Sequence, residues 1–261
     1  GQAGPWGGAR SVAAEPPARG GPHFVVVSTN ELWQRSVAFG IGAPIAAITV
    51  MEAGFFIGAS FVIGQFGAVA LAAHIIAMQM PHITFMIPMG LSQAATVRVG
   101  QAVGRRDAAG AYRAGWAAIV VALLFAATMT GVVVTVPEPF AALFMDAERA
   151  DSTAVLQLAV SLLMFAALFQ IVDALQAVAA GALRGLNDTT LPMVIAGISY
   201  WGLGAGAALW LAFRAGLETE GIWIGFVTGL SASAVMLVTR FKQQQRRGYM
   251  PEIIKDDVAS T

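Results

Sequence analysis

The sequence has 261 residues, of which 57% are hydrophobic and only 11% are charged. Because soluble domains carry about 25% charged residues, this composition indicates an integral membrane protein. The net charge is zero, which argues against nucleic acid as a partner, and the absence of cysteine excludes disulfides, thiolate metal sites and cysteine nucleophiles.

The N-terminal segment, residues 1–23, is rich in Gly, Pro, Ala and Arg. It lacks the apolar core of a signal peptide, and we expect it to be disordered because it has little apolar surface to bury. A misassigned start or an artefact accounts for this segment as well as a functional tail does. Residues 24–35 form a polar lead-in to the first apolar stretch.

Six long apolar stretches predict membrane-spanning α-helices, since a helix satisfies its own backbone hydrogen bonds in lipid. In chain order they are 36–64, 71–97, 114–136, 155–183, 191–213 and 221–239. The predicted fold class is therefore all-α and integral membrane. A six-helix transmembrane bundle extends over residues 36–242, and residues 243–261 form a polar cytoplasmic tail.

The basic residues predict the orientation of the chain. If the N-terminus is cytoplasmic, only Arg149 and Arg214 of the fifteen basic residues lie outside, as the positive-inside rule requires. The acidic connection over residues 137–151 is then external, and both termini are cytoplasmic. We expect a multi-pass protein of the plasma (inner) membrane.

Proline and tryptophan mark features within the spans. Pro81 predicts a kink or local unwinding in the second span. Trp223 falls near a span end, where an indole N–H can remain hydrated. Trp201 lies well inside the fifth span, and it either packs in the bundle or lines a cavity, with packing the preferred interpretation.

Glu52 and Asp173 are the only acidic residues inside the predicted spans. An ionised side chain at mid-bilayer costs at least ~2.5–3.5 kcal/mol, so a functional role is the default hypothesis. The predicted spans contain no Lys or Arg to neutralise the two acids. They therefore indicate a site that loads and releases cations, although an acid that only fixes helix packing is the alternative.

Polar residues around Asp173 extend the candidate site. Helical spacing places Phe169, Gln170 and Gln176 close to the same face as Asp173. Two acids facing one cavity would bind a proton readily, or would share Na⁺ between carboxylate and amide oxygens. A Na⁺ site at Glu52 and Asp173 is thus the one metal site that the sequence suggests.

Small residues on two spans predict close helix packing. Ala177, Gly181 and Gly185 recur every four residues, and Gly54 and Gly58 follow Glu52 on the first span. Such patterns allow the backbone of another helix to approach.

The second span carries His74 and Met78 as candidate cavity-lining residues. His74 and His82 are eight residues apart, about 80° of rotation and ~12 Å of rise, so they do not form a metal pair. A histidine satisfied within the bundle is the preferred interpretation of His74. Met78 either fills a gap or supplies an adaptable lipophilic surface.

The connection over residues 184–192 resembles the N-terminus of a helix. Asn187, Asp188 or Thr189 can cap the fifth span, and Pro192 is tolerated in its first turn. We expect this segment to be structural.

Several motifs occur together in an order that resembles the MATE (multidrug and toxic compound extrusion) family, in particular its NorM-like bacterial branch. The resemblance covers roughly residues 36–245. It begins with the glutamate-bearing first span and continues through LAAHIIA, FMIPMGLSQAATVRVGQAVG, PEPFAALFMD, FQIVDALQAVAAGALRGLNDTTLP and GIWIGFVTGLSASAVML.

The resemblance implies a fold and a site. Family members have twelve helices in two six-helix lobes, and this chain resembles the second lobe alone. The family places a cation-coupling glutamate in the seventh helix and an aspartate in the tenth, which correspond to Glu52 and Asp173. A tyrosine often precedes the aspartate by one turn, but Phe169 stands there and lacks the hydroxyl. Coupling to H⁺ and coupling to Na⁺ therefore both remain open.

The resemblance also implies an activity and partners. We expect an antiporter that exports cationic or amphipathic organic compounds by alternating access, with H⁺ or Na⁺ as the coupling ion and no other cofactor. The alternatives are a lipid-linked oligosaccharide flippase, an inactive assembly lobe and, less favoured, an intramembrane enzyme that uses Glu52, Asp173 and His74. A flippase would need a groove lined by Arg or Lys. The missing first lobe implies either a fragment or a homodimer of two copies.

Overall fold

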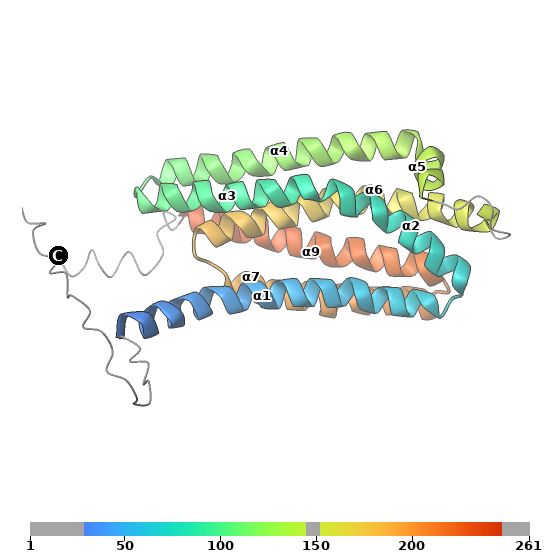
Figure 1. Ribbon diagram of the computed structural model, residues 1–261, viewed down its shortest axis with the longest axis horizontal. Coiled ribbons are helices and arrows are strands. Elements are labelled where there is room, and N and C mark those ends of the chain that lie inside the picture. The colour runs from blue at the N-terminus through green and yellow to red at the C-terminus, as the bar shows by residue number, and fades with distance from the viewer. Residues whose placement is uncertain (1–28, 145–151, 247–261) are drawn as a thin grey trace, which may run out of the picture. The chain divides into compact units, whose positions relative to one another are not determined.

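The computed structural model describes residues 29–144 and 152–246 (Figure 1). The predicted N-terminal segment 1–23, part of the lead-in, part of the 137–151 connection and most of the C-terminal tail lie outside the described residues. Within the described part, every regular element is helical. Six of the resulting segments are long and apolar enough to cross a membrane, which confirms the predicted all-α membrane fold.

The helices follow the predicted spans with different ends. Their bounds are α1 Thr29–Gly64, α2 Ala68–Thr84, α3 Met86–Gly104, α4 Ala108–Thr135, α5 Pro137–Leu143, α6 Ser152–Gly185, α7 Thr190–Gly197, η1 Ile198–Gly204, α8 Ala205–Phe213 and α9 Glu218–Arg246. The short helix α5 occupies part of the acidic connection that we predicted between the third and fourth spans.

The second span is broken at Phe85, between α2 and α3. The two helices together form one apolar segment, Ala68–Gly104, which is ten residues longer than the predicted span because both of its ends extend further. Phe85 N–H donates to the carbonyl of Pro81 at 2.8 Å, so the backbone bonding of α2 continues past the proline. Pro81 lies inside α2 and has no N–H to donate to the carbonyl of Ala77, and this missing bond allows the helix to bend.

The fifth span contains seven residues of π-helix, η1, between α7 and α8. Tyr200 is fully buried, whereas the neighbouring Trp201 is 51% exposed. Trp201 packs on the backbone of α1 at Gly54, and its Nε1 donates to the carbonyl of Met51 at 3.2 Å. Trp201 thus packs against α1, in line with the preferred interpretation, although half of its surface remains exposed.

Helix α6 is the central helix of the unit from Phe39 onward, and it packs against α2, α3, α4, α5 and α9 (Figure 1). Its small residues do allow close approach. A side chain at Gly181 or Gly185 would collide with the backbone of α3 at Ser92 or Thr96. Ser92 Oγ donates to the carbonyl of Ala177 at 2.7 Å, which fastens the two helices at this line of contact.

Helices α8 and α9 form a second close pair. A side chain at Gly221 or Gly225 would collide with the backbone of α8 at Ala212 or Ala208. One turn further, the Cα of Gly204 lies 3.0 Å from the ideal Cβ position of Gly229. The recurrence of glycine every four residues on α9 therefore brings the two backbones together.

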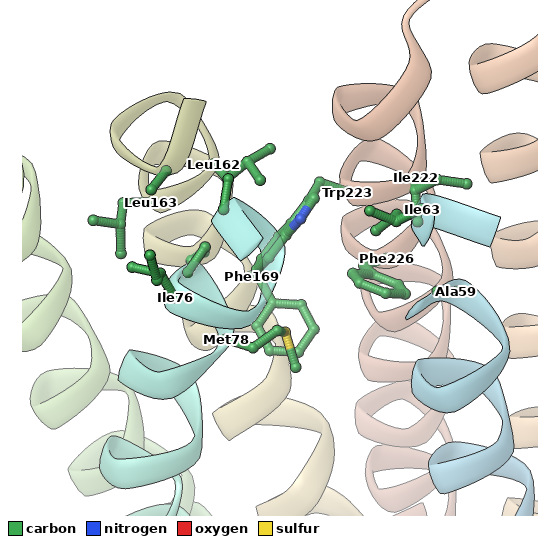
Figure 2. Packing of buried hydrophobic residues seen from close by; sticks show 14 of the residues in the cluster. Ala59, Ile63, Ile76, Met78, Leu162, Leu163, Phe169, Ile222, Trp223 and Phe226 are labelled. Carbon is green, nitrogen blue, oxygen red and sulfur yellow. The ribbon is translucent and has the colours of Figure 1, made fainter. Parts of the chain in front are cut away.

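Aromatic side chains fill the core where α1, α2, α6 and α9 meet. Figure 2 shows Phe169 lying among Met78, Trp223 and Phe226. The Phe169 and Trp223 rings meet edge to face with centroids 6.2 Å apart. Trp223 is fully buried and its Nε1 has no hydrogen-bond partner among the described residues. Our expectation that this indole N–H stays hydrated at a span end was wrong, because α9 begins earlier than predicted.

Candidate coupling site

The side-chain amide of Gln176 connects Glu52 to the bundle interior. Gln176 Nε2 donates to Glu52 Oε1 at 3.3 Å. The opposite end of the amide, Oε1, accepts from Tyr200 Oη at 2.8 Å and from Ser233 Oγ at 3.2 Å. Because two hydroxyl donors hold the amide oxygen, the amide NH₂ group is directed to the carboxylate.

Glu52 and Gln176 line one cavity of about 260 Å³, which we call the carboxylate pocket. Its polar walls come from α1, α3, α6 and the residue before α7, and they are formed by Thr49, Glu52, Ser92, Gln93, Gln176, Arg184 and Thr189. Apolar residues complete it, among them Ile48, Phe85, Met89 and Leu237. The pocket thus holds a carboxylate and several oxygen and nitrogen ligands within an apolar enclosure.

Asp173 lies one turn before Gln176 on α6 and is only 7% exposed. Its Oδ1 has no hydrogen-bond partner among the described residues. An ionised carboxylate with an unpaired buried oxygen is strongly unfavourable. A bound proton or a small cation would remove this penalty.

Arg184 is a basic residue of the carboxylate pocket. The expectation that the spans contain no Arg or Lys was wrong, because the spans of the structure are longer than predicted and include Arg184 together with Arg98, Arg113, Arg240 and Lys242. Arg184 Nη2 donates to Ser92 Oγ at 2.9 Å, and its Nε has no hydrogen-bond partner in the described part of the chain. The pocket therefore holds both a carboxylate and a guanidinium.

Gln170 does not join Gln176 in this pocket. Its Nε2 donates to the carbonyl of Ala126 at 3.3 Å and to Thr130 Oγ1 at 3.1 Å, and its Oε1 accepts from Thr84 Oγ1 at 2.9 Å. These bonds connect α6 with α4 and α2. Phe169 is likewise held in the core, and neither residue lines the carboxylate pocket.

His74 and Met78 line a separate cavity of about 350 Å³ between α1 and α2, which we call the histidine pocket. His74 Nε2 lies 3.1 Å from Ser60 Oγ, whose hydroxyl donates to the carbonyl of Phe56 at 3.1 Å. Since that hydroxyl has one proton, His74 Nε2 is the donor to Ser60. His74 is thus held in the bundle apart from the pocket that Glu52 lines.

The connection before α7 differs from the predicted cap. Thr189 occupies the N-cap position, but its side chain makes no capping hydrogen bond. Asp188 instead accepts from Arg240 Nε and Gln244 Nε2, both at 2.7 Å. The carboxylate therefore fastens this turn to α9.

Sequence reasoning missed Tyr200, Ser233 and Arg184 as members of the site. Tyr200 could not be placed because the π-helical segment changes the angular position of every residue after Gly197. Ser233 continues the four-residue spacing of Gly221, Gly225 and Gly229 on α9. That spacing could have identified the face of α9 that packs against the bundle interior.

Comparisons with known proteins identify the family. The family model described as MatE matches residues 44–210. The chain belongs to this family. A probable multidrug resistance protein NorM from Mesorhizobium japonicum is 47% identical over 206 residues, which are 79% of this chain and 44% of that relative. The multidrug resistance protein NorM from Burkholderia vietnamiensis is 40% identical over 84% of this chain and 47% of its own length.

Solved structures share the fold. The crystal structure of the eukaryotic MATE transporter AtDTX14 has a TM-score of 0.73 at 23% identity, covering 85% of this chain and 50% of that one. A MATE structure in the bent conformation has a TM-score of 0.75 at 16% identity, covering 85% of this chain and 47% of that one. The chain thus spans less than half the length of the curated relatives named above, as one lobe of a MATE transporter would.

Proposed function

We propose that this chain is the coupling lobe of a multidrug antiporter, in which Glu52 and Asp173 bind the ion whose downhill flow drives export. The observation that supports this proposal is the Gln176 amide, which donates to Glu52 at 3.3 Å and lies one turn after the buried Asp173. The same amide thus belongs to the surroundings of both acids. Binding of the ion at one acid would alter the bonding around the other.

The cargo in this proposal is a cationic or amphipathic organic compound, since the homologues are named as multidrug resistance proteins. The coupling ion is H⁺ or Na⁺. Moving one charge across 100 mV supplies ~2.3 kcal/mol, which is enough for useful accumulation outside. We propose a plasma (inner) membrane location with cytoplasmic termini, and assembly with a second lobe or a second copy of the chain.

The contacts of Glu52 in the carboxylate pocket suggest how binding of a cation could change the position of α1. Glu52 faces Gln176 on one side and shares the pocket with Arg184. When Glu52 loses its cation, its negative charge is stabilised by the amide and by the nearby guanidinium. When the cation returns, both contacts weaken, and a change of this kind can bias α1 between two positions.

The test is export of a fluorescent organic cation by cells that lack other multidrug exporters and express the full-length protein containing the chain. We expect Glu52→Gln and Asp173→Asn each to abolish gradient-driven export at unchanged membrane abundance. Glu138→Gln is the matched control, since Glu138 is exposed at the start of α5. Gradient-driven export that survives in both variants would overturn the proposal.

The ion is identified in vesicles that contain the purified protein. A Na⁺ gradient at equal pH on both sides and a pH gradient without Na⁺ are imposed separately. The gradient that drives uptake of the dye in the parent protein, and fails in both variants, is the coupling gradient. Uptake that needs neither gradient contradicts the antiport proposal.

A further inference from the structure

We propose that the turn between α3 and α4 holds the head group of an anionic phospholipid. A cavity of about 460 Å³ opens between the two helices at this end. Three arginines line it, one from α3, one from the turn and one from α4: Arg98, Arg105 and Arg113. This cavity is separate from the carboxylate and histidine pockets.

The three guanidinium groups are available for an anion. All three residues are exposed, and none of them forms an ion pair with another described residue. The one carboxylate in the lining, Asp107, is the N-cap of α4 and accepts from Gly110 N–H at 2.7 Å. The cavity therefore has a net excess of positive charge, and guanidinium groups bind phosphate oxygens in paired hydrogen bonds.

The remaining lining is small and apolar. It consists of Gly110 and six alanines, contributed by both helices: Ala94, Ala95, Ala102, Ala114, Ala117 and Ala118. Such side chains leave a shallow trough that leads from the arginines along the two helices. Further along α4, Val120, Val121 and Leu124 are 50%, 49% and 64% exposed, as expected of a surface that meets hydrocarbon.

The three arginines together with the adjoining apolar surface favour a lipid over a free anion as the ligand of this cavity. A phosphodiester in the membrane interface would reach the arginines while its acyl chains lie against the apolar surface of α4. Basic pockets between membrane helices on the cytoplasmic side bind anionic head groups in this manner. The positive-inside rule alone would account for the arginines, but it would not require a trough between them.

The experiment measures lipid retained by the purified full chain in neutral detergent, using native mass spectrometry. Phosphatidylglycerol is the anionic probe and phosphatidylcholine of the same acyl chains is the neutral one. We expect one molecule of phosphatidylglycerol to be retained preferentially. The double variant Arg98→Gln/Arg113→Gln should weaken its retention about 25-fold, since one basic residue near an anionic membrane surface contributes about fivefold.

The control removes the same charge elsewhere. Arg106 lies in the same turn and Lys242 on α9, and both are exposed without lining the cavity. Arg106→Gln/Lys242→Gln should retain the lipid like the parent chain. Equal losses in the two double variants, or equal retention of the two lipids, would overturn the proposal. Displacement by millimolar inorganic phosphate alone would also overturn it, because the site would then belong to a soluble anion.

Discussion

Tyr200 donates its hydroxyl proton to Gln176 Oε1 at 2.8 Å, and this bond orients the amide that faces Glu52. Without it, only Ser233 Oγ, at the longer distance of 3.2 Å, holds the amide oxygen. An amide that can rotate presents either an oxygen or an NH₂ group to the carboxylate. The orientation of the amide in the carboxylate pocket thus depends on a residue that does not line it.

Tyr200→Phe should therefore weaken coupling more than it weakens folding. Loss of one buried hydrogen bond costs about 0.5–1.5 kcal/mol of stability, while export at limiting ion gradient should fall several-fold. Thermal unfolding in detergent and dye export measure the two effects. Tyr112→Phe is the control, because Tyr112 is 39% exposed and its ring meets that of Trp116 at a tilt. A Tyr200→Phe protein that exports like Tyr112→Phe would contradict the role assigned to this hydroxyl.

The two glutamines of α6 should separate stability from transport. Gln170→Leu removes the hydrogen bonds that connect α6 with Thr84 and Thr130, so we expect a loss of about 1–3 kcal/mol in unfolding free energy. The protein that remains folded should still export. Gln176→Leu also loses buried hydrogen bonds, to Tyr200 and Ser233, but in addition it should reduce export per folded molecule. An equal loss of export per folded molecule in the two variants would contradict the different roles assigned to Gln170 and Gln176.

Gly181→Ala should force α3 away from α6. The added methyl would collide with the Ser92 carbonyl and hydroxyl, and overpacking of this kind costs about 1–3 kcal/mol. Gly131→Ala in α4 is the matched control because nothing lies within 4 Å of its ideal Cβ position. That control should be neutral or slightly stabilising, as alanine favours helix. The measurement is the melting temperature of each variant. Equal melting temperatures would contradict the close packing of α3 on α6 at Gly181.

Arg184→Gln should strengthen binding of the coupling cation. Removing a positive charge from the pocket that Glu52 lines relieves repulsion of any cation that approaches the carboxylate. We expect the apparent affinity for the coupling ion to rise on the order of threefold to tenfold. The measurement is dye export against ion concentration, with Arg184→Lys as the charge-conserving control. Unchanged affinity in Arg184→Gln would show that the guanidinium acts only through Ser92.

Much of the fold could be predicted because lipid permits few backbone arrangements and apolar length marks them. The six spans and the close packing at Gly181 followed from hydropathy and from four-residue spacing. The choice of Glu52 and Asp173 as candidate site residues rested on the energetic cost of acids in lipid, and their role stays a prediction. Their surroundings did not follow, since a π-helical segment changes which side chains face inward and α6 extends two residues past the predicted span, which includes Arg184.

The glycines of α9 have a mechanical consequence. At Gly204 and Gly229 the backbones of η1 and α9 touch, so no rotamer change can let the two elements slide. Helix α1, over its part from Phe39 onward, is instead held largely by side chains such as Phe55, whose ring stacks parallel to that of Tyr200. Side chains can exchange partners with little loss of contact area. Glu52 therefore lies on an element held through side chains, whereas the glycine-packed pair is in direct backbone contact.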